Sequence, residues 1–105
     1  MRKGDIHRFR VPKALGHEQA GPRFGVIVQA NELLPRSVVL VAPTSSGARA
    51  ASFRPEVKVA NAATKVLVEQ LGAVDSWRLG EKVGHLSTEE MWLVDDALIT
   101  VLGLP

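Results

Sequence analysis

The chain contains no cysteine and no tyrosine, and its only aromatic residues are three Phe and two Trp. The lack of cysteine excludes a disulfide framework and thiolate metal sites, and it is typical of proteins from a reducing compartment. No apolar run approaches the roughly 20 residues that span a bilayer, and the opening MRKGDIHRFR lacks the apolar centre of a signal peptide. We therefore expect a cytoplasmic protein with no membrane segment.

The charge of the chain is small in total but unevenly distributed. At 105 residues we expect a single domain over residues 1–105, with a net charge of +2. Residues 1–54 carry nine Lys/Arg against three Asp/Glu (+6), and residues 55–105 carry four against eight (−4). A basic half of this kind favours a polyanion such as nucleic acid as partner, although charges that only solvate strand faces would give the same pattern.

Two apolar strands with polar residues at their ends stand out in the basic half. Phe24–Ala30 is predicted to be a buried strand entered through a polar loop, and Ser37–Ala42 a second strand that Pro43 ends. If the two pair antiparallel, the start of the first lies beside the end of the second. Arg23 and Thr44 are then expected to meet. Spacing alone would favour a turn threonine that bonds the local backbone.

Alternation and capping signals predict the remaining elements. Further strands are expected over Ile6–Val11, Glu56–Ala60, Thr64–Gln70 and Lys82–Leu86, with a tight turn at Asn61–Ala63 and a short helical turn over Val74–Leu79.

The end of the chain carries a clear helix signal. Ser87 and Glu90 form a capping box, and Gly103 is expected to close the helix. The apolar stripe between them consists of Met91, Val94, Leu98, Val101 and Leu102. The whole pattern predicts an α+β, mainly β fold, in which six short strands form a strongly bent sheet or partly open barrel packed by a C-terminal amphipathic helix.

Six segments, taken in order, resemble the MazF/PemK family of bacterial toxins. They are RKGDI at 2–6, GHEQAGPR at 16–23, VAPTSS at 41–46, VLVEQL at 66–71, VDSWRLG at 74–80 and LSTEEMWLVDDAL at 86–98. The resemblance implies an SH3-like barrel, a homodimer, and an endoribonuclease that cuts single-stranded RNA, chiefly messenger RNA, at short sequences without a metal or other cofactor. It also implies a cognate antitoxin whose flexible acidic tail covers the RNA surface.

The resemblance also assigns two catalytic residues. The family's catalytic arginine follows the GxEQxG element, which Arg23 matches, and its catalytic threonine or serine follows the second strand, which Thr44 matches. The family usually continues from the arginine with proline, whereas Phe24 and Gly25 stand here, so the RNA sequence preference is expected to differ.

The chemistry of metal-free RNA cleavage suits these residue types. The ribose 2'-hydroxyl attacks the adjacent phosphorus, and a guanidinium matches two phosphate oxygens and stays charged at any working pH. We assign this role to Arg23, with Thr44 donating to the phosphate or orienting the 2'-hydroxyl. Glu18 is expected to support Arg23, and His17 is an optional general base, although a solvated histidine is the simpler interpretation.

Other polar and aromatic residues receive plainer predictions. The predicted RNA contacts are Gln19, Ser45, Ser46, Arg49 and Arg54. A solvated loop explains the two arginines equally well. His7 and His85 lack partners at metal-ligand spacing, so no metal site is expected. Trp77 and Trp92 could stack on bases, but core packing or a dimer contact is favoured.

Two other functions stay open. A gyrase poison of the CcdB type shares the fold family, but it relies on a Trp-Gly-Ile end where this chain has Gly103, Leu104 and Pro105. A non-catalytic SH3-like module that binds nucleic acid or peptide is the third alternative.

Overall fold

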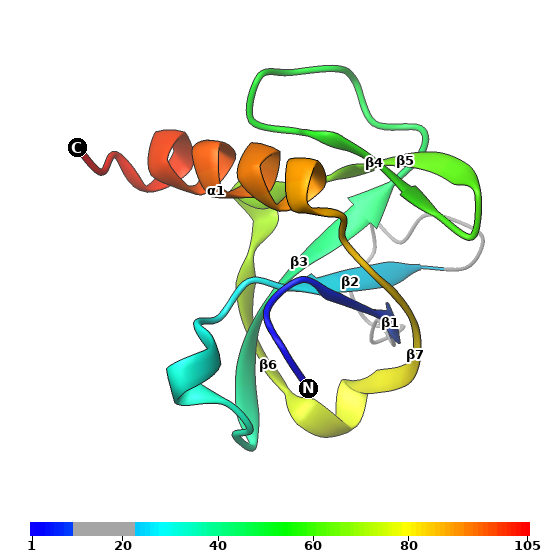
Figure 1. Ribbon diagram of the computed structural model, residues 1–105, viewed down its shortest axis with the longest axis vertical. Helices are drawn as coiled ribbons and strands as arrows, with labels where there is room; N and C mark the ends of the chain where they lie inside the picture. The colour runs from blue at the N-terminus through cyan, green and yellow to red at the C-terminus, as the bar shows by residue number, and fades with distance from the viewer. Residues whose placement is uncertain (10–22) are drawn as a thin grey trace, which may run out of the picture.

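The structure, a computed structural model, describes residues 1–9 and 23–105. Within this part of the chain there are seven strands, one α-helix and three short 3₁₀ helices (Figure 1). The strands are β1 (Asp5–Phe9), β2 (Phe24–Ile27), β3 (Val38–Ser45), β4 (Glu56–Val59), β5 (Ala62–Val66), β6 (Gly72–Asp75) and β7 (Leu79–His85). The helices are η1 (Asn31–Leu33), η2 (Val68–Gln70), η3 (Ser76–Arg78) and α1 (Thr88–Leu102).

All strand pairs are antiparallel, and β3 connects them. The sheet order is β4-β5-β3-β2-β1-β7, with β6 also paired to β3. The first half of β3 pairs with β6, its middle with β2, and its end with β5. One strand that serves three partners along its length must twist strongly, and the sheet bends around it as a partly open barrel (Figure 1). The predicted mainly β fold with a C-terminal helix is confirmed.

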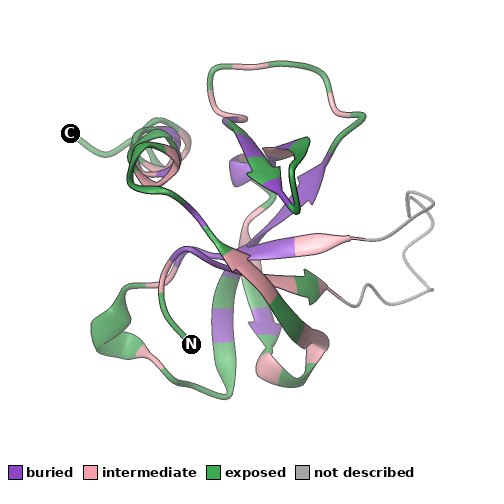
Figure 2. Ribbon diagram, turned by 45° about the vertical axis from the view of Figure 1, so that its right-hand side comes forward, coloured by how far each residue is buried: buried purple, intermediate pink, exposed green. Residues whose placement is uncertain are grey.

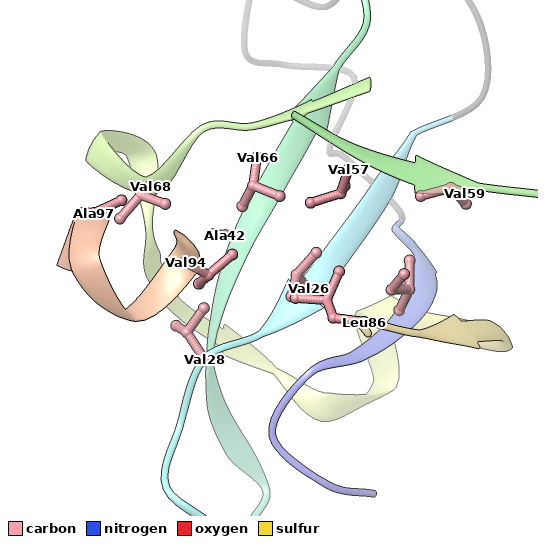
Figure 3. Close-up of a cluster of buried hydrophobic side chains, with 11 residues drawn as sticks. Val26, Val28, Ala42, Val57, Val59, Val66, Val68, Leu86, Val94 and Ala97 are labelled. Atoms are coloured by element: carbon pink, nitrogen blue, oxygen red, sulfur yellow. The ribbon is translucent and has the colours of Figure 1, made fainter. Parts of the chain in front are cut away.

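Apolar clusters lie on both faces of this bent sheet. The larger one combines strand residues with Val94 and Ala97 of α1, and Val68 of η2 lies beside Ala97 (Figure 3). The smaller one, on the other face of β3, contains Val39 and Val41. Successive residues of a strand point to opposite faces, so β3 contributes to both clusters. Figure 2 shows the buried stretches where the strands cross and the exposed outer side of α1.

The helix α1 begins and ends as its sequence predicts. Ser87 Oγ accepts from the amide of Glu90 at 3.1 Å, and Glu90 Oε1 accepts from the amide of Ser87 at 2.9 Å, so the capping box is confirmed. Gly103 ends the helix in the left-handed conformation, with φ of 65°. No helix within residues 1–9 and 23–105 has the length and apolar character needed to cross a membrane.

Pro43 does not end the second apolar strand, and that prediction was wrong. β3 continues through Pro43 and Thr44 to Ser45. Proline has no amide hydrogen to donate, but its carbonyl accepts from the amide of Leu67 at 2.8 Å. The end of β3 therefore stays in the sheet, paired with β5.

Several other element boundaries differ from the prediction. β2 ends at Ile27, not Ala30, and β5 ends at Val66, after which η2 replaces the predicted strand end. The tight turn falls on Ala60 and Asn61, whose φ values of 51° and 67° are typical of a two-residue hairpin turn.

The region after η2 contains a strand that the sequence pattern missed. The predicted helical turn over Val74–Leu79 is split into β6 and η3, and β7 begins at Leu79 instead of Lys82. β1 begins at Asp5, and Arg10 and Val11 of the predicted first strand lie outside the described residues.

Candidate active site

The start of β2 and the end of β3 lie side by side, as the sequence predicts. Gly25 pairs with Pro43, and Val26 with Ala42. Continuing this antiparallel register by one and two positions places Phe24 across from Thr44 and Arg23 across from Ser45. Arg23 and Thr44 are therefore diagonal neighbours at one corner of the sheet.

Arg23 precedes the regular part of β2. Its carbonyl accepts from the amide of Phe9 at 2.9 Å, so its backbone is tied to β1. Strict alternation would direct its side chain away from the face of Thr44, because residues one apart point to opposite faces. Arg23 stands before the first strand residue, Phe24, so alternation does not fix its side chain. The side chain of Arg23 can reach the hydroxyl of Thr44 only by departing from this alternation.

The two hydroxyl residues at the end of β3 are buried. Thr44 and Ser45 are each only 4% exposed. Thr44 pairs with Val66 and Ser45 with Lys65 of β5, so both backbones are fixed by the sheet. A hydroxyl held this rigidly can be presented at a defined position, which a reacting group requires.

Three of the predicted site residues fall on the loop that precedes Arg23. His17, Glu18 and Gln19 lie outside the described residues. Their predicted roles as general base, support for Arg23 and RNA contact stay predictions.

Arg8 is an arginine near this corner that the sequence interpretation did not select. Arg8 pairs with Phe24 across β1 and β2, and its guanidinium carbon lies 5.9 Å from the centre of the Phe24 ring. Its side chain is 56% exposed and its Nε lies 3.8 Å from Glu81. The strand register places Arg8 in the same cross-strand row as Phe24 and Thr44, and the alternation of Ile6 and Arg8 indicated only that these two residues share a face.

The loop that follows β3 carries the other predicted RNA contacts. Ser46 and Arg49 are exposed. Arg54 differs, because its side chain is only 22% exposed and its Nη2 lies 2.6 Å from Glu69 Oε2. Burial raises the pKa of Glu69, but the hydrogen bonds from Arg54 outweigh this effect, so the pKa lies below its ordinary value. Glu69 is a partner that the sequence interpretation did not identify.

The described histidines bond to other parts of the fold. His7 Nδ1 donates to the carbonyl of Gly80 at 2.9 Å, and His85 Nδ1 donates to Asp5 Oδ1 at 2.8 Å. Across residues 1–9 and 23–105, no three His, Asp or Glu side chains gather in a way that could hold a metal ion. Trp77 and Trp92 are 67% and 62% exposed, so neither belongs to the core of this chain.

Nearly the whole chain matches a known toxin family. Residues 2–102 match the family model of the PemK-like, MazF-like toxin of the type II toxin-antitoxin system. A candidate toxin of Mycobacterium tuberculosis is 39% identical over 104 residues, which cover 97% of each chain. The endoribonuclease MazF of Staphylococcus epidermidis is 34% identical over 113 residues, covering 99% of this chain and 92% of that one.

The solved structures agree on the fold. An endoribonuclease from a mycobacterial species, solved in complex with its cognate antitoxin, aligns with a TM-score of 0.80 at 20% identity. The alignment covers 100% of this chain and 97% of that chain. At this level of identity the likeness shows the shared fold.

Proposed function

Because the chain belongs to the PemK-like, MazF-like family of toxins from type II toxin-antitoxin systems, we propose that it is a metal-independent endoribonuclease that cleaves single-stranded RNA, chiefly messenger RNA. The observation that carries the proposal is the pairing of β2 with β3, because it makes Arg23 and Thr44 diagonal neighbours. These are the two positions that match the family's catalytic pattern. The named activity of the Staphylococcus epidermidis relative supports the same reaction class.

The proposed reaction uses the RNA's own 2'-hydroxyl. The 2'-oxygen forms a bond to the adjacent phosphorus, the bond from phosphorus to the 5'-oxygen breaks, and the proton lost by the 2'-hydroxyl is balanced by one gained at the 5'-oxygen. The products are a 2',3'-cyclic phosphate and a 5'-hydroxyl. His17 is the optional acceptor of the first proton, and Glu18 would support Arg23.

Arg23 and Thr44 would stabilise the charge that develops in this reaction. The guanidinium of Arg23 would donate to two phosphate oxygens, and the buried hydroxyl of Thr44 would donate to one of them or orient the 2'-hydroxyl. Because a guanidinium keeps its charge at any working pH, a pH dependence of cleavage would report the proton acceptor instead.

The proposed partners follow from the family and the charge distribution. A cognate antitoxin with a flexible acidic tail would cover the basic loops and neutralise Arg23, and a structural neighbour is named as a complex with its antitoxin. Association should slow as salt is raised. We also propose a homodimer in the cytoplasm.

The test is cleavage of a long single-stranded RNA of defined sequence in EDTA, with the new 5' ends mapped. The wild type should give discrete fragments with 2',3'-cyclic phosphate ends, and Arg23→Ala should cleave about 100- to 1000-fold more slowly. Arg36→Ala is the matched control, since Arg36 is an exposed arginine just before β3 begins, and it should cleave at the wild-type rate.

Thr44 allows an equally specific pair of variants. Thr44→Val keeps the shape of this buried side chain but removes its hydroxyl, and it should slow cleavage by on the order of 100-fold. Thr44→Ser keeps the hydroxyl and should stay close to the wild type. Intact RNA with the wild type would reject the proposal, and inhibition of gyrase without RNA cleavage would support the CcdB-type alternative.

A further inference from the structure

The loop between β3 and β4, residues 46–55, is held from both ends. It leaves the sheet directly after Ser45, and the carbonyl of Pro55 at its far end accepts from the amide of Val66 at 2.9 Å. Figure 1 shows it standing away from the strands at the top of the molecule, and Figure 2 shows exposed and partly buried stretches along it. Near its end, Phe53 packs against the larger core and Pro55 is buried, whereas Ser46 and Arg49 are exposed, so the outer part of the loop needs specific contacts to keep one shape.

The side chain of Arg54 supplies these contacts inside the loop. Its Nε and Nη2 donate to Glu69 Oε2 at 2.9 and 2.6 Å, and its Nη1 donates to the carbonyl of Arg49 at 3.1 Å. Its own amide donates to the carbonyl of Ala51 at 3.0 Å. All three nitrogens of the guanidinium therefore bind protein acceptors, and the Arg49 backbone is fixed through Arg54.

Glu69 belongs to a segment that is packed into the core. It lies in η2, where the neighbouring Val68 is fully buried and packs in the larger core beside Ala97 of α1 (Figure 3). The amide of Leu67, just before η2, donates to the carbonyl of Pro43 in β3. The carboxylate of Glu69 is therefore an anchor fixed to the core, to which Arg54 attaches the loop.

The pair is poorly suited to stabilising the fold as a whole. Glu69 Oε1 is buried, and none of the described residues offers it a hydrogen-bond partner. A buried acceptor without a partner costs stability, so the pair stabilises the fold less than a fully bonded pair would. What the pair does provide is geometry, because a two-pronged arginine contact fixes orientation as well as distance.

We propose that Arg54 and Glu69 are positioning residues that hold the loop 46–55 in the shape that presents Ser46 and Arg49 to RNA, and that Arg54 is not itself a phosphate contact. This inference rests on the proposed ribonuclease function. Both side chains are only about a quarter exposed and already bound to each other, whereas Ser46 and Arg49 are exposed.

Variants of Glu69 distinguish a positioning role of Arg54 from a direct contact of Arg54 with phosphate. RNA binding is measured by fluorescence anisotropy with a labelled single-stranded RNA, in an Arg23→Ala background so that the RNA stays intact. If Arg54 positions the loop, Glu69→Gln and Arg54→Ala should each raise Kd by about 10-fold, and the double variant by no more than either alone. If Arg54 contacts phosphate, Glu69→Gln should instead leave the affinity unchanged or increase it, which would overturn the proposal.

Two further variants sharpen this comparison. Arg54→Lys keeps the charge but loses the forked geometry, so positioning predicts a Kd close to that of Arg54→Ala, whereas a phosphate contact predicts a Kd close to that of the parent. Arg36→Ala removes an equal charge from outside the loop and should change Kd by less than about 2-fold.

Hydrogen exchange of the loop amides provides a readout that does not depend on RNA. Exchange over residues 46–55 should be faster in Arg54→Ala and Glu69→Gln and unchanged in Arg36→Ala. Unchanged exchange in the first two variants would overturn the proposal. If the wild type failed to cleave RNA, the proposed function would fail. The exchange data would still decide whether the Arg54–Glu69 pair holds the loop.

Discussion

Two carboxylates of this protein, Asp5 and Glu69, are held by basic side chains, but in different ways. Asp5 is bonded on both oxygens, since Oδ1 accepts from His85 and Lys82 and Oδ2 accepts from the amide of Arg2. Glu69 is bonded by Arg54 on Oε2, while Oε1 is buried and finds no partner among the described residues. Both carboxylates stabilise the fold, but a fully bonded one contributes more than one with an oxygen left unbonded.

The difference follows from what each carboxylate connects. Asp5 joins the N-terminal turn to the start of β1 and the end of β7, all of which belong to the framework of the sheet. Glu69 joins the core to the loop 46–55, which carries Ser46 and Arg49. We infer that the first region maintains the fold and that the second maintains the shape of a binding loop.

The largest effect on stability should come from Asp5→Ala. The side chain of Asp5 is 2% exposed, so its removal leaves the amide of Arg2 and two basic groups without their acceptor. We expect a loss of about 2–3 kcal/mol in the free energy of unfolding, measured by urea denaturation. The cleavage rate of the remaining folded protein should stay at the wild-type level.

Asp96→Ala is the matched control for Asp5. Asp96 is an exposed carboxylate on α1, and its loss should change the free energy of unfolding by less than about 0.5 kcal/mol. If Asp5→Ala cost no more than this control, the contrast between the two regions would not hold.

Acidification should lower the stability that each of the two carboxylates contributes. Burial raises the pKa of Asp5, but hydrogen bonds from His85, the Arg2 amide and Lys82 outweigh it and bring the pKa below its ordinary value. The pKa of Glu69 is also lowered. The unfolded chain therefore binds more protons, so the stability contributed by both groups is present above these ordinary values and is lost as pH falls through the lowered ones.

Urea denaturation at several pH values between 7 and 3 checks this expectation. The free energy of unfolding should fall toward low pH, and the fall should be smaller in Asp5→Asn, which cannot take up the proton. A variant that follows the same pH profile as the wild type would mean that Asp5 does not contribute to the acid sensitivity.

The sequence predicted best those features that depend on neighbouring residues. The helix over 88–102 was predicted because Ser87 and Glu90 cap it and its apolar residues recur every three or four positions. The end of β3 was predicted wrongly because its continuation past Pro43 depends on the amide of Leu67. This amide donates to the carbonyl of Pro43 only in the folded sheet. β6 was missed because four residues, one of them glycine, carry too little alternation to indicate a strand.

The candidate site shows the same division. Arg23 and Thr44 were found because each stands at the end of an apolar run, and the order of motifs assigned their roles. The partner of Arg54 is 15 positions away and that of Asp5 is 80 positions away. Neither spacing follows a helical or strand period, so only the folded topology determines these pairs.

A smaller effect, from Glu90→Ala, tests whether burial or the number of hydrogen bonds makes Asp5 important. Glu90 also uses both oxygens, since Oε1 accepts from the amide of Ser87 and Oε2 from the amide of Lys58 on β4, both at the exposed surface. Water can replace these bonds, so we expect a loss of about 1 kcal/mol by urea denaturation, well below that for Asp5→Ala. Equal losses in the two variants would show that the bonds themselves, and not their burial, set the cost. The distinction between a framework carboxylate and a loop-holding one would then have to rest on the RNA-binding effects of Glu69 alone.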